Sequence, residues 1–188
     1  MPMRQLLLLR HAKSSWDAKG VSDQDRPLSP RGRRAAALMR GAMLDLGLAP
    51  DIVLISPARR TRETLEALQP WDEAPLIEPT AKLYLATAPQ LLEVLREMPE
   101  TARSVLLIGH NPGLHDLSLR LVGGRDAPAR TPASDRARTR LAEGYPTGAL
   151  AEFGIAGSWA QVDTGSGQLI RFLRPRDLPQ HGSGAPEA

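Results

Sequence analysis

The chain has 188 residues, a length that suits one domain with its own hydrophobic core and is short for two. It contains no cysteine, which excludes disulfides, thiolate catalysis and thiolate zinc sites, and its net charge of +3 with 4% aromatic residues does not favour a nucleic-acid binder. No apolar run approaches the ~18 residues of a membrane-spanning helix, and the N-terminus has no signal-peptide pattern, so we expect a cytoplasmic protein without a membrane partner.

Five short segments are predicted to be strands. Residues 5–9, 52–55 and 105–108 are continuous apolar runs, which is typical of strands buried on both faces. Residues 149–153 and 168–173 follow, and the second of these alternates apolar with polar side chains. Helical patterns lie between these strands, so the alternation predicts a three-layer α/β/α sandwich around a mostly parallel sheet.

The helix starts are marked by capping side chains. Such a side chain precedes a proline at three places, Ser29-Pro30, Ser56-Pro57 and Asn111-Pro112. Proline is common at the first position of a helix, directly after the cap. Thr87 and Gln90 have the spacing of a capping box. These signals predict helices that begin directly after residues 29, 56, 87 and 111.

The region from residue 123 to residue 145 breaks this pattern. It is rich in Ala, Pro, Gly and Arg and has no clear apolar face before Leu141, so we expect a long surface loop with at most a short helix. Residues 179–188 are rich in Gly and Pro, and we expect a disordered tail. Residues 1–178 are therefore predicted to form a single domain, and the lack of a strong apolar patch favours a monomer.

Histidines and arginines follow three of the predicted strands. Arg10 and His11 follow the first, Arg60 lies shortly after the second, and His110 follows the third. Because ligands of open α/β sheets bind beyond the carboxyl ends of the strands, we expect these side chains to meet. Helix N-termini and guanidinium groups both bind oxyanions, so the sequence predicts a phosphate pocket at this edge.

The same segments resemble a known family. Arg10-His11-Ala12, the run from Ser56 to Thr64 and Gly109-His110-Asn111-Pro112 are similar to the signature elements of the histidine phosphatase superfamily, which has the phosphoglycerate-mutase-like fold. Residues 10–14, 25–32 and 146–150 resemble the SixA-type phosphohistidine phosphatases in particular. The resemblance covers about residues 3–175, and the ordered set of these elements is specific.

The resemblance implies a role for each matching residue. His11 would be the nucleophile that carries a covalent phosphoryl group, Arg10 and Arg60 would clamp the phosphate, and a protonated His110 would also bind it. The candidate substrate-binding residues are Lys13, Ser14, Arg26 and Asn111, with Arg26 equally suited to anchoring its own loop. Arg59 does not match the family register and is expected at the surface. With three cationic groups for the phosphoryl oxygens, we expect no metal and no cofactor.

The general acid of the related mutases and ester phosphatases has no counterpart in the sequence. The corresponding stretch, residues 82–88, contains no carboxylate, and Glu78 lies upstream in the wrong register. Asp23 and Asp25 form a D-x-D pair, but they do not follow a strand as an aspartyl phosphotransferase loop would. A P–N substrate needs the acid less than an ester does, because its leaving nitrogen can be protonated beforehand.

The preferred hypothesis is therefore a metal-independent phosphohistidine phosphatase that acts on a phosphate-bearing substrate such as a phosphohistidine protein. One alternative is a small-molecule phosphomonoesterase of the same superfamily, with the same pocket residues. A second alternative is a phospho-ligand-binding module that has lost catalysis. The sequence argues against that module, because Arg10, His11, Arg60 and His110 are all present.

Overall fold

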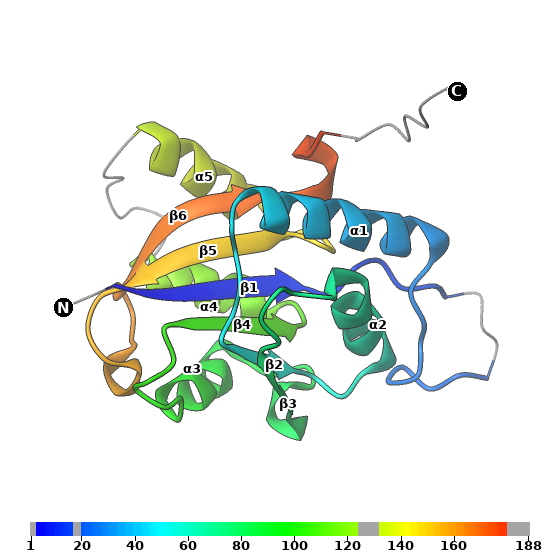
Figure 1. Ribbon diagram of the computed structural model, residues 1–188, viewed down its shortest axis with the longest axis horizontal. Coiled ribbons are helices and arrows are strands. Elements are labelled where there is room, and N and C mark those ends of the chain that lie inside the picture. The colour runs from blue at the N-terminus through cyan, green and yellow to red at the C-terminus, as the bar shows by residue number, and fades with distance from the viewer. Residues whose placement is uncertain (1–2, 17–19, 124–131, 180–188) are drawn as a thin grey trace.

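A computed structural model describes residues 3–16, 20–123 and 132–179. Six strands form one sheet in the order β3-β2-β4-β1-β5-β6 (Figure 1). Their bounds are β1 (Arg4–Arg10), β2 (Ile52–Ile55), β3 (Leu76–Pro79), β4 (Ser104–Gly109), β5 (Leu150–Ile155) and β6 (Gly167–Leu173). The pairs β1–β4, β2–β4 and β2–β3 are parallel, whereas β5 is antiparallel to both of its neighbours. The mostly parallel sheet predicted from the sequence is thus confirmed.

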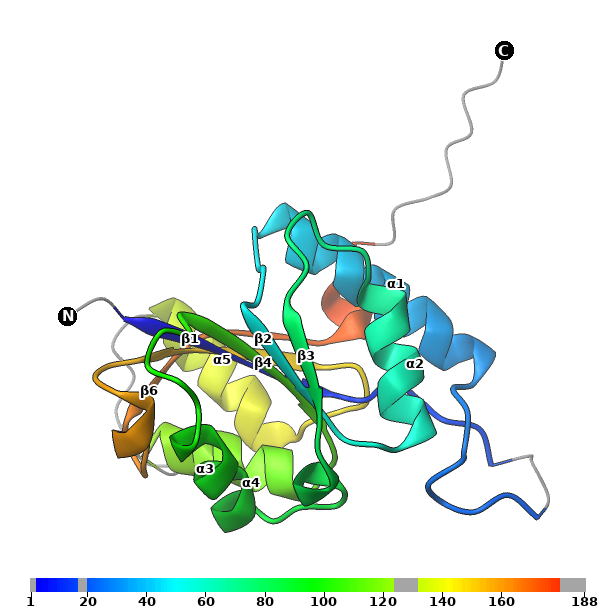
Figure 2. The same cartoon turned by 60° about the horizontal axis from the view of Figure 1, so that its bottom comes forward.

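Helices cover both faces of this sheet. The α-helices are α1 (Pro30–Asp45), α2 (Arg59–Leu68), α3 (Ala88–Arg96), α4 (Gly113–Leu121) and α5 (Pro132–Glu143). Short 3₁₀ turns lie at η1 (Ala81–Leu83), η2 (Trp159–Gln161) and η3 (Pro175–Asp177). Figure 2 shows α1 and α2 on one side of the sheet and α3 and α4 on the other. The architecture is therefore the predicted three-layer α/β/α sandwich.

The alternation of side chains along β1 explains why two hydrophobic cores form. Leu6 and Leu8 are fully buried with apolar residues of α3, α4 and α5, whereas Leu7 and Leu9 are buried with those of α1 and α2. A strand that is buried on both faces reads as an uninterrupted apolar run, because successive side chains point to opposite faces. This burial fixes the position of β1, and its carboxyl end carries Arg10 and His11.

Two of the predicted helix starts are wrong. Ser29 does cap α1, because its side chain accepts a hydrogen bond from the Gly32 N–H. In contrast, α2 begins at Arg59 with Ala58 as its N-cap, and α4 begins at Gly113 with Pro112 as its N-cap. The Ser56 and Asn111 side chains make contacts near the histidines instead, as described below. Short polar side chains before a proline also suit loops, so the signal does not distinguish a cap from a loop contact.

The segment 123–145, predicted as a surface loop with room for a short helix, forms α5 in its second half. Ala137 and Leu141 of α5 are buried against the α3–α4 side of the sheet, and the intervening positions are mostly exposed. Strand β3 was not predicted, because all four of its residues are exposed at the edge of the sheet. Residues 124–131 of the predicted loop and all but the first residue of the predicted tail lie outside the described residues. Within the described part of the chain, no helix is long and apolar enough to cross a membrane.

Candidate active site

A cavity of about 430 Å³ lies where β1 and β4 end. Its lining comes from separate parts of the chain: the segments after β1 and β4, the loop before α1, helix α2, and the segments after η1 and before β5. The described residues that line it are Arg10, His11, Lys13, Ser14, Trp16, Asp23, Arg26, Arg60, Leu85, His110, Asn111 and Thr147. The structure therefore brings together all eight residues that the sequence proposed for the site.

His11 is held as a neutral ring with one free nitrogen. Its Nδ1 lies 2.7 Å from the Ala12 carbonyl oxygen, which can only accept, so Nδ1 carries the hydrogen and Nε2 keeps its lone pair. Burial is the main cause that lowers the pKa of His11 to about 4, and the charges of Arg60 and Arg10 add to it. At neutral pH the ring is therefore unprotonated, and the Nε2 lone pair is available.

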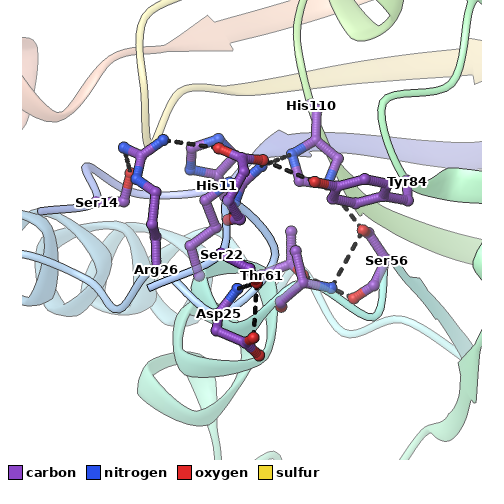
Figure 3. A network of polar contacts seen from close by, with 12 residues as sticks. His11, Ser14, Ser22, Asp25, Arg26, Ser56, Thr61, Tyr84 and His110 are labelled. Atoms are coloured by element: carbon purple, nitrogen blue, oxygen red, sulfur yellow. Dashed lines mark hydrogen bonds and ion pairs between the residues drawn. The ribbon is translucent and has the colours of Figure 1, made fainter. Parts of the chain in front are cut away.

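His110 lies beside His11, with ring centroids 5.2 Å apart (Figure 3). Its Nε2 is 2.7 Å from Ser56 Oγ, and its Nδ1 is 3.4 Å from a guanidinium nitrogen of Arg60. Because a guanidinium group can only donate, Nδ1 accepts and Nε2 donates to Ser56. Burial, the neighbouring His11 and Arg60 lower the pKa of His110 to about 3. The expected protonated His110 is therefore not the form present in the free cavity, because neighbouring cations and desolvation disfavour it.

Helix α2 fixes Arg60 relative to His11. The Thr64 hydroxyl donates to the Arg60 carbonyl oxygen at 2.6 Å and accepts from the Ala12 N–H at 3.0 Å. Arg60 is 3% exposed, in contrast to its neighbour Arg59, whose side chain is half exposed and pairs with Glu63. The structure thus separates the two adjacent arginines as the sequence predicted.

Arg10 approaches the cavity from the end of β1. One of its guanidinium nitrogens donates to the Tyr145 carbonyl oxygen at 2.8 Å, and the same oxygen accepts from Asn111 Nδ2 at 3.0 Å. The Gly148 N–H lies 3.1 Å from the carbonyl oxygens of both Arg10 and His11. The segment before β5 therefore holds the Arg10 side chain and its backbone in place.

The remaining predicted residues lie around the mouth of the cavity. Arg26 donates to Ser14 Oγ at 2.6 Å and to the Ser15 carbonyl oxygen at 3.1 Å, and its guanidinium carbon is 3.3 Å from the ring centroid of Trp16. It thus anchors its loop and lines the cavity at the same time. Lys13 is exposed at the rim. Glu78 lies on the exposed edge strand β3 and does not line the cavity.

Asp23 and Tyr84 belong to this site, although the sequence did not single them out for it. The Asp23 carboxylate accepts hydrogen bonds from the Arg60 guanidinium at 3.0 Å and from the Tyr84 hydroxyl at 2.7 Å. The hydrogen bond from Tyr84 is the main cause that lowers the pKa of Asp23 to about 2. Tyr84 also packs edge-on against His110. The spacing Asp23-x-Asp25 was the signal available, but Asp23 reaches the cavity from a loop rather than from a strand end.

The arrangement suits transfer of a phosphoryl group. Arg10 and Arg60 supply cationic donors for phosphoryl oxygens, and His11 supplies a nucleophilic nitrogen in the same cavity. Among the described residues, no group of three His, Asp or Glu side chains is placed to hold a metal ion. A cavity with these parts suits a phosphatase.

Comparison with known proteins leads to the same class. Residues 6–82 match the family model of the histidine phosphatase superfamily (branch 1). An uncharacterized protein of Mycobacterium tuberculosis is 34% identical over 170 residues, which are 89% of this chain and 100% of the relative. The chain belongs to the histidine phosphatase superfamily and is a phosphatase.

Two solved structures narrow the resemblance within this superfamily. The candidate phosphohistidine phosphatase SixA from Nakamurella multipartitia matches with a TM-score of 0.78 and 29% identity over 93% of this chain and 98% of that one. The SixA candidate from Agrobacterium tumefaciens matches with a TM-score of 0.75 and 28% identity over 93% of this chain and 100% of that one. The protein is therefore SixA-like in sequence and fold.

Proposed function

We propose that this protein is a phosphohistidine phosphatase that acts through a covalent phospho-His11 intermediate and needs no metal ion. One observation carries the proposal: His11 is neutral, its Nδ1–H is tied to the Ala12 carbonyl, and its Nε2 is free within an arginine-lined cavity. The likeness to SixA candidates supports the substrate class.

The reaction would proceed in two displacements. In the first, the Nε2 lone pair of His11 attacks phosphorus, the P–N bond of the substrate breaks, and its electron pair stays on the leaving nitrogen. Arg10 and Arg60 would neutralise the charge on the phosphoryl oxygens. In the second, water attacks phosphorus, the P–Nε2 bond breaks, and the proton released from water passes to a phosphate oxygen or to solvent. His11 returns to its starting tautomer, because Nδ1 keeps its hydrogen throughout.

The ionisation of Asp23 supports a P–N substrate over an ester. An alkoxide leaving group needs a proton from a general acid. With its pKa held at about 2, Asp23 has no proton to donate near neutral pH. A phosphorylated imidazole whose distal nitrogen is already protonated leaves as a neutral ring and needs no proton from the protein.

The test is phosphate release from a phosphohistidine peptide in the presence of EDTA, with native protein and His11→Ala compared. We expect EDTA-resistant turnover by the native protein and its loss, by about a thousandfold or more, in the variant, because nucleophilic catalysis is removed. Arg59→Ala is the matched surface control and should keep the native rate. Turnover that survives His11→Ala would overturn the covalent mechanism. Efficient hydrolysis of phosphate esters, without turnover of the peptide, would favour the phosphomonoesterase alternative.

A further inference from the structure

A carboxylate within a phosphate pocket requires a physical explanation. Asp23 lines the same cavity as His11, Arg10 and Arg60, and it carries a negative charge. Like charges at close range repel, so this carboxylate disfavours a substrate that brings only the negative charge of a phosphate ester. The same charge attracts a substrate that carries a positive charge next to its phosphoryl group.

The contacts of Asp23 show that it is held in place and still has room for a further donor. Its Oδ1 accepts from Arg26 at 2.9 Å, and its Oδ2 accepts from Tyr84 at 2.7 Å and from Arg60 at 3.0 Å. Arg60 also donates to the main-chain carbonyl of Asp23, which fixes the backbone. A carboxylate has about four acceptor positions, so the three side-chain donors found among the described residues leave one. The Asp23 side chain is 45% exposed, so a ligand can reach it.

We propose that Asp23 determines the leaving-group specificity: it accepts a hydrogen bond from a positively charged nitrogen leaving group, as in a phosphoimidazolium, and thereby favours phosphoramidates of this kind over phosphate esters. This inference rests on the proposed function and adds a residue that selects the substrate. It also assigns the rim beside Asp23 and Arg26, where Trp16 is 79% exposed, as the region that the leaving group occupies.

The charges balance during this step. The substrate ring carries the phosphoryl group on one nitrogen and a hydrogen on the other, so the ring is cationic. When His11 attacks, the electron pair of the breaking P–N bond returns to the ring, which becomes a neutral imidazole. The N–H that faces Asp23 is retained, so Asp23 neither gains nor loses a proton. Its function is to stabilise the cationic ring that makes a good leaving group.

Asp23→Asn tests this role because it removes the charge and keeps the shape and one acceptor oxygen. The full chain is assayed with a phosphohistidine peptide and with phenyl phosphate. We expect kcat/KM for the peptide to fall by about tenfold, the effect of losing one hydrogen bond between charged groups. We expect kcat/KM for phenyl phosphate to stay the same or to rise. Asp25→Asn is the control, because Asp25 is an exposed carboxylate of the same loop that pairs with Ser22 and does not line the cavity.

The ratio of kcat/KM for the peptide to kcat/KM for phenyl phosphate distinguishes a specificity role of Asp23 from a structural one. If kcat/KM of Asp23→Asn falls equally for both substrates, Asp23 only positions Arg60. If kcat/KM rises equally for both substrates, Asp23 only competes with phosphate for Arg60. Either result, or no change, would overturn the inference while leaving the proposed function intact. A native protein that hydrolyses phenyl phosphate but not the peptide would overturn both proposals, and that result is visible before any variant is made.

Discussion

The surroundings of the two histidines lower both pKa values and keep the rings neutral well below the ordinary histidine pKa of about 6.5. Both are less than a tenth exposed, and Arg60 and Arg10 add positive charge nearby. In the proposed mechanism a neutral His11 needs no separate base, and a neutral His110 can acquire a proton once a phosphoryl group brings negative charge. Because both rings resist protonation in the folded protein, the fold loses stability at acid pH.

The pH dependence of stability follows from these pKa values. Unfolded histidines titrate near 6.5, whereas those in the fold titrate at about 4 for His11 and about 3 for His110. Between these limits the unfolded chain binds more protons, so the free energy of unfolding is highest above pH 6.5 and falls as the pH drops toward 4. At pH 5 each ring should remove about 2 kcal/mol relative to pH 7.5. Urea unfolding at the two pH values in phosphate-free buffer measures this difference.

The variant His11→Ala provides the comparison for this measurement. Because one of the two resistant rings is removed, the loss of stability between pH 7.5 and pH 5 should shrink by about 2 kcal/mol. If the loss has the same size in the native protein and in the variant, the pKa of His11 in the folded protein is not lowered.

At the scale of elements, the site depends on how closely α4 approaches the segment before α3. A Cβ atom built on Gly113, the first residue of α4, would lie 1.8 Å from the Ala86 carbonyl oxygen. The contacted segment carries Tyr84 and Leu85, and α4 begins three residues after His110. This close backbone approach therefore sets the position of both sides of the cavity.

Gly113→Ala should separate these two elements. We expect a loss of about 2 kcal/mol or more in the free energy of unfolding, because backbone must move, together with a lower kcat/KM. Urea unfolding and phosphatase assays measure the two effects. Gly109→Ala is the control, because its Cβ would meet side chains rather than backbone, Leu107 at 3.3 Å and Leu114 at 3.7 Å, and a side chain can adjust. Equal effects of the two substitutions would show that the approach of α4 to Ala86 is not restrictive.

The sequence predicted the elements whose signals are local and missed those decided by tertiary contacts. Strands β1, β2 and β4 are visible as apolar runs because both of their faces are buried. Strand β3 is exposed, and α5 buries few of its side chains, so neither has a strong pattern. In the site, residues at strand ends could be predicted from topology. Asp23 and Tyr84 could not, because Asp23 reaches the cavity from a loop and Tyr84 contacts Asp23 and His110 from the segment after η1.

At the scale of the whole molecule, the cavity joins segments that are distant in the chain. Arg10 and His11 follow β1, Arg60 lies on α2, and His110 follows β4, while the loop with Asp23 precedes α1. Each of these elements belongs to the same sheet or packs against it, and the two hydrophobic cores lie on opposite faces of that sheet. An anion that contacts several of these side chains at once therefore links the helix layers on both faces of the sheet at the end where β1 and β4 stop.

Inorganic phosphate should stabilise the entire domain for this reason. A ligand that binds only the folded state, at a hundred times its dissociation constant, adds about 2.7 kcal/mol, which corresponds to roughly 5–10 °C in Tm for a domain of this size. Thermal unfolding with and without phosphate, at constant ionic strength, measures the shift. Arg60→Ala should abolish the shift because it removes the buried guanidinium that is proposed to clamp phosphate, whereas Arg59→Ala should retain it because that side chain points to the surface and pairs with Glu63. A shift that survives Arg60→Ala would mean that phosphate stabilises the domain from another place, and the clamp role of Arg60 would have to be abandoned.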